Sequence, residues 1–202
     1  MRISELSRVA GVPVATVKYY LREGLIAPGT ATAPTQAQYD ESHVRRLRLA
    51  RALIQVGGLS VAAARDVLAA LNTPDATLHQ TLGAAHAALS PPRADDQEPS
   101  HARRLVHAWG WRVHPDAPAL QQLEHALTAL ADVGAPAREG RLARYAYLAH
   151  QIAEVDVAEV PAKSADEAAT TVVIGTVLWE PVLLALRRLA QEAVSADVLD
   201  HN

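Results

Sequence analysis

The side chains best suited to chemistry in this sequence lie near its N-terminus, where polar groups able to bind nucleic acid come close together. They are a hydroxyl, an amine and two phenols, at Thr16, Lys18, Tyr19 and Tyr20. Val14, Val17 and Leu21 have the spacing of an apolar helix stripe, which leaves those four side chains on the exposed face. Such groups reach phosphate oxygens and base edges when a helix enters the major groove of DNA. The pattern therefore predicts a recognition helix.

Another short helix is expected directly before this one. Apolar residues with a helical period predict it over about residues 3–10, with Ser4 as its N-cap. Gly11 ends it, Pro13 suits the first turn of the next helix, and Gly24 suits the C-terminus of the recognition helix. The two helices and their tight turn predict a helix-turn-helix. The apolar positions of the first helix are Ile3, Leu6, Val9 and Ala10.

Further motifs follow in a fixed order up to about Leu71. They are Lys18-Tyr19-Tyr20, Glu23-Gly24-Leu25, Tyr39, Val44-Arg45-Arg46-Leu47 and Val56-Gly57-Gly58-Leu59-Ser60. In these motifs the sequence resembles the MerR family of bacterial transcription regulators. It departs from the family where Gln36-Ala37-Gln38-Tyr39 replaces a Gly-Tyr-Arg wing motif. The resemblance implies a winged helix-turn-helix that binds double-stranded promoter DNA as a homodimer and bends it, so that RNA polymerase can engage.

The expected DNA contacts come from the helix-turn-helix, the wing and the helix after the wing. Four arginines of that last helix cannot all face one phosphate track, and we expect Arg46 to reach the DNA backbone before its neighbours. The expected DNA-binding residues are Ser4, Thr16, Lys18, Tyr19, Tyr20, Gln38, Tyr39, His43, Arg46 and Arg51.

The composition indicates a globular protein, since half of its 202 residues are hydrophobic. Because it has no cysteine, the chain forms neither disulfides nor thiolate metal sites. We find no signal peptide and no apolar run that would span a membrane, and therefore expect a cytoplasmic protein. Residues 1–71 carry nine Lys or Arg against five Asp or Glu, a net +4, and the remainder carries ten against seventeen, a net −7. A basic DNA-binding head with an acidic body fits this asymmetry.

Residues 1–72 are expected to form the winged-helix DNA-binding domain. After the recognition helix we expect a hairpin wing at residues 27–35, a third helix from Asp40 or Ser42 to about Val56, a break at Gly57-Gly58, and a fourth helix at residues 61–71 capped by Ser60.

A short dimerisation helix is expected over residues 73–90, because apolar residues recur there with heptad spacing. The predicted dimer interface is Leu78, Leu82, Ala85 and Leu89. Short isolated coiled coils are marginal, so the body is expected to help hold the dimer. The alternative is a helix packed on its own body. The Pro-rich, charged residues 91–100 predict a linker.

Residues 101–202 predict an all-α helical bundle, which makes the whole protein mostly α. Its helices are expected at residues 102–109, 117–133, 138–157 and 165–198, the last one kinked near Pro181. We recognise no catalytic motif, no metal-ligand spacing and no cofactor-binding loop, and therefore expect no metal, no cofactor and no enzyme.

Aromatic residues gather in the body of a chain that has no Phe. The candidate effector-binding residues are Trp109, Trp111, Tyr145, Tyr147 and Trp179, with Glu180 beside the last. Aromatic walls with a nearby charge can bind a hydrophobic or cationic small molecule, and core packing is the alternative role. We therefore expect a MerR-type regulator that binds a pseudo-palindromic promoter site as a homodimer and responds to an organic effector. The alternative is a DNA-architectural or protein-interaction factor without a ligand.

Overall fold

A computed structural model describes residues 1–33, 36–71, 78–89, 99–158 and 165–200 of the chain. The chain divides into two compact units, one formed by Met1–Thr77 with Val173–Asn202 and the other by Leu78–Val172. The first unit therefore takes in a C-terminal segment that the sequence analysis places in the body. Of the predicted linker, only Pro99 and Ser100 lie within the described residues, and Pro34 and Thr35 of the wing lie outside them.

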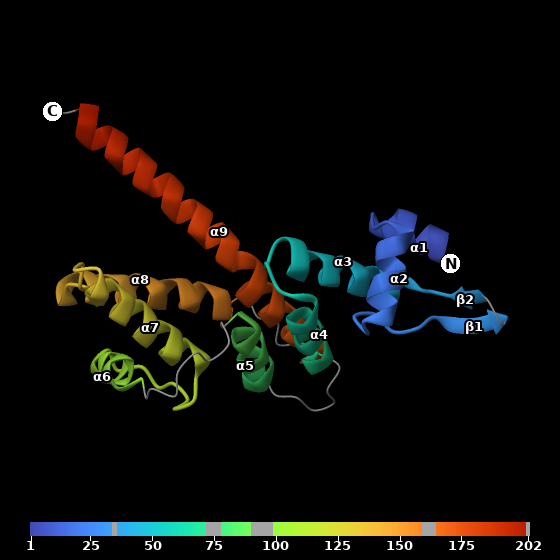
Figure 1. The fold of residues 1–202 in the computed structure, drawn as a ribbon, viewed down its shortest axis with the longest axis horizontal. Helices are drawn as coiled ribbons and strands as arrows, with labels where there is room; N and C mark the ends of the chain where they lie inside the picture. The colour runs from blue at the N-terminus through green and yellow to red at the C-terminus, as the bar shows by residue number, and fades with distance from the viewer. Residues whose placement is uncertain (34–35, 72–77, 90–98, 159–164, 201–202) are drawn as a thin grey trace. The chain divides into compact units, whose positions relative to one another are not determined.

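The first unit is a winged helix-turn-helix, as predicted. Figure 1 shows the two-stranded antiparallel sheet projecting from the helices of this unit. Helix α1 packs on α2 and α3, and α3 packs on α4. The core between them contains the fully buried Leu6, Val17, Leu47 and Leu68. The elements are α1 (Ile3–Ala10), α2 (Val14–Arg22), β1 (Thr30–Ala33), β2 (Gln36–Gln38), α3 (Glu41–Gln55) and α4 (Val61–Ala70).

The turn between α1 and α2 depends on Gly11, as the sequence predicts. Gly11 has φ of 69°, a left-handed conformation that glycine adopts without steric cost. Ser7 supports the turn, since its Oγ donates a hydrogen bond to the Val12 carbonyl oxygen at 2.5 Å. The prediction that Ser4 caps α1 is wrong, because the N-cap is Arg2 and no side chain caps this helix end.

The second unit is helical, and its helices fall where the sequence predicts them. Its core brings Ala102, Val106 and Leu120 together from α6 and α7. The Glu124 carboxylate on α7 accepts a hydrogen bond from the Ala102 N–H at 2.7 Å and so caps the start of α6. The helices are α5 (Leu78–Leu89), α6 (Ser100–Ala108), α7 (Pro118–Asp132), α8 (Glu139–Ala158) and the first turns of α9 (Ala165–Asp200).

Helix α5 is the one predicted to hold the dimer. Leu78 and Leu82 lie in the helix, but their side chains lie outside the described part of the structure. Ala85 is fully buried within the single chain, and the Leu89 carbonyl oxygen accepts a hydrogen bond from Gln122 Nε2 of α7 at 3.3 Å. These contacts favour the alternative in which α5 packs on its own body.

Helix α8 carries an apolar stripe that is exposed. Tyr145, Leu148, Ile152 and Val155 have helical spacing, and each is at least 40% exposed. The small Ala146 is the buried residue of α8.

Helix α9 continues through Pro181 and is docked on the first unit near its N-terminal end. Val173 and Val177 are fully buried. Gly57, at the end of α3, makes room for this contact, because a Cβ there would lie 2.4 Å from Val177 Cγ1 and 2.7 Å from the Leu53 carbonyl oxygen.

Candidate nucleic-acid interface and a second, aromatic site

The outer face of α2 presents a mixed basic and aromatic surface. Lys18 is exposed, and Thr16 and Tyr19 are half-buried. The guanidinium of Arg22 lies over the Tyr19 ring, 5.1 Å from its centroid, and its Nε is 3.4 Å from Glu23 Oε1. Arg22 was not among the predicted contacts, although its place three residues after Tyr19 puts the two side chains on one helix face.

Tyr20 does not lie on this face, which corrects the sequence expectation. Its side chain is 5% exposed and packs inward with Val17, its ring centroid 6.0 Å from that of Tyr19. Burial raises the pKa of the Tyr20 phenol, and the nearby charge of Arg51 partly opposes that rise. The helical period places Tyr20 at the border between the buried face of Val17 and the exposed face of Lys18. Tyrosine has an apolar ring and a polar hydroxyl, so its residue type fits either face and does not decide between them.

Arg46 does not extend toward solvent from α3, although we expected it to reach the DNA backbone. Its Nε donates to the Leu25 carbonyl oxygen at 3.2 Å and its Nη2 donates to the Leu68 carbonyl oxygen at 2.5 Å. Burial lowers the pKa of the guanidinium. Arg46 therefore ties the end of the recognition helix to α4.

Two further arginines of α3 also bind main-chain oxygens. Arg48 Nη2 donates to the Val9 carbonyl oxygen at 2.7 Å, and Arg51 Nη1 donates to the Gly11 carbonyl oxygen at 2.7 Å. Both acceptors lie at the C-terminal end of α1, where helix carbonyls lack helical partners and the dipole favours a positive charge. Arg51 is exposed, so DNA can still reach it. Its guanidinium is nevertheless already bound to the turn between α1 and α2 through the Gly11 carbonyl oxygen.

The wing is anchored at its base by Tyr39. This residue is 9% exposed, and its backbone N–H and carbonyl oxygen bond to the carbonyl oxygen and N-terminal amine of Met1, at 2.8 and 2.7 Å. Its ring packs edge-on against His43 with centroids 5.2 Å apart. Gln38 and Ser4 are exposed, as is Arg51, so these three are the expected contacts outside α2 that solvent reaches freely.

His43 and Asp40 form the capping box at the start of α3. Asp40 Oδ1 accepts from the Ser42 and His43 backbone N–H groups and lies 2.8 Å from His43 Nδ1. Hydrogen bonds from Ser42 and then His43 hold the pKa of the Asp40 carboxyl far below its usual range. The other ring nitrogen of His43, Nε2, is buried and has no hydrogen-bond partner among the described residues.

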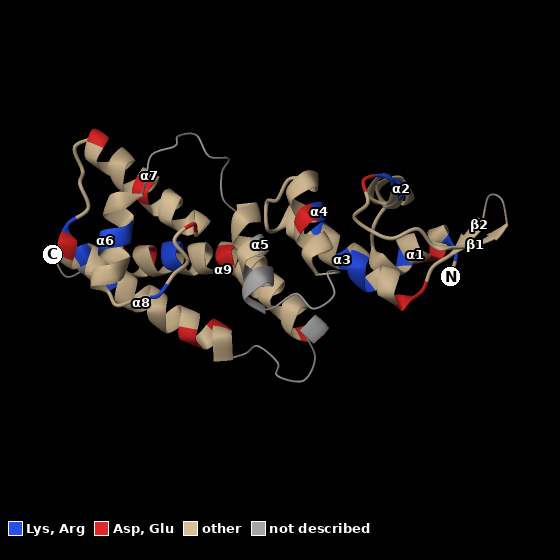
Figure 2. Ribbon diagram, turned by 90° about the horizontal axis from the view of Figure 1, so that it is seen from below, with Lys and Arg blue, Asp and Glu red and all other residues tan. Residues whose placement is uncertain are grey.

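Exposed basic side chains of the head lie just before α1 and on α1, α2, α3 and α4, and Figure 2 shows the Lys and Arg positions in blue. They include Arg2, Arg8, Lys18, Arg22 and Arg45. A helix-turn-helix that carries exposed cations on its second helix can bind the phosphate backbone and insert α2 into the major groove.

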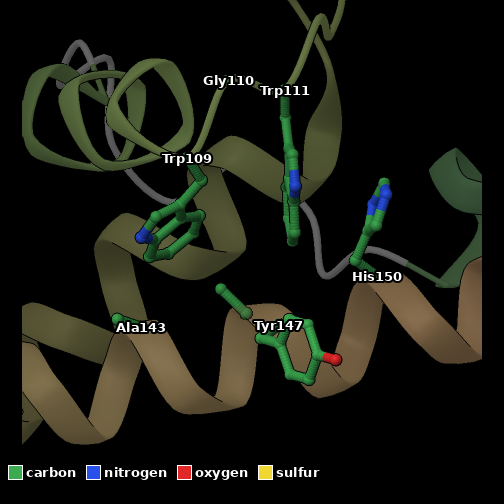
Figure 3. A pocket seen from close by; sticks show the side chains of 7 residues that line it. Trp109, Gly110, Trp111, Ala143, Tyr147 and His150 are labelled. Atoms are coloured by element: carbon green, nitrogen blue, oxygen red, sulfur yellow. The ribbon is translucent and has the colours of Figure 1, made fainter.

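The second unit contains a separate candidate site, an aromatic cavity of about 340 Å³. Figure 3 shows Trp109 and Trp111 facing side chains that rise from α8. The two indoles meet at 60° with centroids 5.2 Å apart, and the Trp111 ring stacks on His150 at 5.9 Å and 23°. The lining residues are Trp109, Gly110, Trp111, Ala143, Ala146, Tyr147 and His150.

This cavity brings together three of the predicted effector residues and leaves out the others. Trp109, Trp111 and Tyr147 line it, whereas Tyr145 and the α9 residues Trp179 and Glu180 are exposed elsewhere. His150, whose Nε2 lies 3.6 Å from Glu154 Oε1, lines the cavity as well and was not among the predicted residues. Its spacing of three residues from Tyr147 is the helical signal that would have placed both on one face.

The fold and the exposed cations of α2 define a winged-helix DNA-binding protein. Residues 1–71 match the MerR HTH family of regulatory proteins. Residues 1–71 therefore form a helix-turn-helix domain of the MerR type.

Similar proteins support the same family. The chain is 40% identical over 47 residues to the HTH-type transcriptional regulator ZntR homolog of Haemophilus influenzae, a match that spans 23% of this chain and 35% of that protein. It is 36% identical over 69 residues to the HTH-type transcriptional regulator HmrR of Sinorhizobium medicae, over 34% of this chain and 46% of that protein. The chain thus spans less than half of either curated relative.

A solved structure resembles the whole chain. The crystal structure of the putative transcriptional regulator SCO5550 from Streptomyces coelicolor A3(2) has a TM-score of 0.71 and 40% sequence identity. The similarity covers 98% of this chain and 97% of that one. The helical second unit is therefore shared with a protein of the same overall length.

Proposed function

We propose that the protein is a cytoplasmic, homodimeric regulator that binds a pseudo-palindromic promoter site and responds to an organic small molecule. The observation that carries the DNA-binding part is the exposed Lys18 surface of α2 in a head that matches the MerR family. Two heads related by a two-fold axis suit a site with two similar halves, and RNA polymerase would engage the promoter that they deform.

We assign the DNA contacts to side chains on the α2 surface that solvent can reach. Lys18 and Arg22 bring positive charge, and Tyr19 and Thr16 bring hydroxyls at the same face. Gln38 adds a contact from the wing. Tyr20 is left out because its side chain is in the core, and Arg46 is left out because its donors already bind carbonyl oxygens.

The test of this interface is the salt dependence of DNA binding. Each cation that displaces a phosphate counterion contributes about one unit to the slope of log K against log salt. Lys18→Ala should therefore flatten the slope by about one and weaken binding. Arg187→Ala, which removes an exposed charge of α9 outside the helix-turn-helix, is the matched control and should leave the slope unchanged. An unaltered slope in folded Lys18→Ala would remove Lys18 from the interface.

The effector site that we propose is the aromatic cavity of the second unit. Its volume of about 340 Å³ lies at the lower end of the range for small-molecule sites, and flat indole, phenol and imidazole rings wall it. Such walls suit a flat aromatic or a cationic organic molecule. Binding would alter DNA affinity only if the ligand favours one arrangement of the two heads.

Tryptophan emission gives a direct test of the effector site. Trp179 lies outside the cavity, so in a Trp179→Phe background the emission comes from Trp109 and Trp111. Cationic and neutral aromatic compounds should quench it, and Trp111→Ala should abolish the binding measured by calorimetry. Tyr145→Ala is the control, because it removes a ring of α8 that does not line the cavity. If no compound binds, the protein is a DNA-architectural or protein-docking factor instead.

A further inference from the structure

An exposed apolar seam runs along α9 within the first unit. Its residues are spaced alternately by four and three, which is the repeat of a coiled coil, and we call them the α9 seam. Its large members are Trp179, Val182, Leu186 and Leu189, which are 47%, 40%, 55% and 62% exposed. The complete seam is Gly175, Trp179, Val182, Leu186, Leu189, Ala193 and Ala196.

The opposite side of the same helix already has a partner. Val173 and Val177 are fully buried, and Val177 contacts the head at Gly57. Glu180, Arg187 and Arg188 occupy the outer heptad positions and leave the seam free of charge. The helix is therefore docked on its own head by one side and presents an uncharged heptad stripe on another.

We propose that the α9 seam is the dimer interface and that its occupant is α9 of a second copy, running antiparallel. A two-fold axis at the level of Leu184 pairs Val182 with Leu186 of the second copy, Trp179 with Leu189, and Gly175 with Ala193. Large residues thus meet large ones and small meet small. A parallel pair would instead place Trp179 on Trp179 and Gly175 on Gly175, and would align the two helix dipoles.

Two other features favour a second copy over a lipid bilayer. The segment Glu167–Asp197 is long and apolar enough to cross a membrane, and its most apolar 18 residues have a mean hydropathy of 1.8. However, Glu180 lies within it, where a charge in a membrane span is costly, and Val173 and Val177 are buried, Val177 against the DNA-binding head, which would have to enter the bilayer with them. Leu184 and Val194 are exposed off the seam, but the residues with coiled-coil spacing form a continuous uncharged stripe, which is the surface that a second helix can cover.

The pairing also places two heads where one DNA site can use them. Val177, which touches the head, would lie opposite Gln191 of the second copy, so the two Val177 positions are about 21 Å apart along the axis at 1.5 Å per residue. Each head sits on the outer side of its own α9. Two-fold-related heads are what a pseudo-palindromic site requires. This inference rests on the proposed function, in which the protein acts as a dimer. It places the dimer interface on α9 and not on α5.

Sedimentation of the full chain tests the interface. Leu189→Asp should convert the dimer to a monomer by raising the dissociation constant of the dimer on the order of 100-fold. The reason is that each dimer loses two buried leucines. Val194→Asp is a closely matched control: Val194 lies on the same helix and is also 62% exposed, but it is off the seam, so the dimer should persist. Circular dichroism should show both variants folded, since both changes replace exposed side chains.

Crosslinking tests the antiparallel direction, since the chain has no cysteine of its own. A short bis-maleimide should join copies of the double variant Gly175→Cys, Ala193→Cys through residue 175 of one copy and residue 193 of the other, identified by mass spectrometry; within one helix these positions are about 27 Å apart, beyond the reach of the linker. Links between residue 175 and residue 175 would overturn the antiparallel arrangement.

The remaining outcomes separate this inference from the proposed function. A wild-type dimer that Leu189→Asp leaves intact overturns the α9 seam while the homodimeric regulator stands. A wild-type monomer that binds its operator with one head overturns both. A monomer that sediments with phosphatidylglycerol vesicles, and loses this with Leu189→Asp, assigns the seam to lipid and overturns the dimer.

Discussion

Replacing Arg46 by methionine should destabilise the head without altering its charge contact with DNA. Methionine keeps much of the aliphatic stem and removes the guanidinium, which binds the Leu25 and Leu68 carbonyl oxygens. A hydrogen bond to a charged group contributes about 1.5–3 kcal/mol. The Nε bond is long at 3.2 Å, and the half-buried site lets water reach the freed oxygens, so we expect a loss of about 2–3 kcal/mol in the free energy of unfolding.

The assays are urea and thermal unfolding of the full chain, each followed by far-ultraviolet circular dichroism. For a chain of this size the expected loss lowers Tm by roughly 5–10 °C. Arg45→Met is the matched control, because it removes the same group from the neighbouring, exposed position of α3 and should leave the midpoint nearly unchanged. If Arg46→Met keeps the wild-type midpoint and instead lowers the salt slope of DNA binding by about one, the guanidinium contacts phosphate and our reasoning is refuted.

Two further changes probe the packing of α9 and the cap of α3. Gly57→Ala should lower stability by about 1–3 kcal/mol, since the new Cβ would overlap Val177 and the Leu53 carbonyl oxygen, and thermal unfolding measures it; Gly83→Ala, where nothing lies within 4 Å, should be neutral or stabilising. Asp40→Asn should destabilise the protein at neutral pH. Because the folded pKa of Asp40 lies below its ordinary value, its stabilisation is present above about pH 4 and fades as pH falls through the lowered pKa. Urea midpoints of the two proteins should therefore converge in acid, and a constant gap would show that the carboxylate charge is not the cause.

The helical elements followed from local signals. Gly11 and Gly24 marked helix ends that the structure confirms, with φ of 69° and 74°, and Asp40 marked the start of α3. Each signal depends on a few neighbouring residues, so the sequence contains it completely.

The roles of the side chains depend on partners that are distant in sequence, so they were harder to predict. Arg46 was predicted to bind phosphate because its acceptors, the carbonyl oxygens of Leu25 and Leu68, belong to the main chain. Main-chain acceptors cannot be recognised from the types of the residues that carry them. The helical period of α8 places Leu148 and Ile152 on one face but does not predict that both are exposed, since a period tells which residues share a face and not what covers that face. For the same reason, only three of the six predicted effector-binding residues line the aromatic cavity.

The arginines of α3 have a consequence for how this head can acquire new targets. Arg46, Arg48 and Arg51 hold the helix-turn-helix by carbonyl oxygens, which every amino acid supplies in the same place. The exposed side chains of α2 are therefore not needed for that attachment, and they can be exchanged while the frame stays fixed. A library that varies Thr16, Lys18, Tyr19 and Arg22 should yield stable heads with altered operator preference, so the scaffold is suited to the engineering of orthogonal genetic switches.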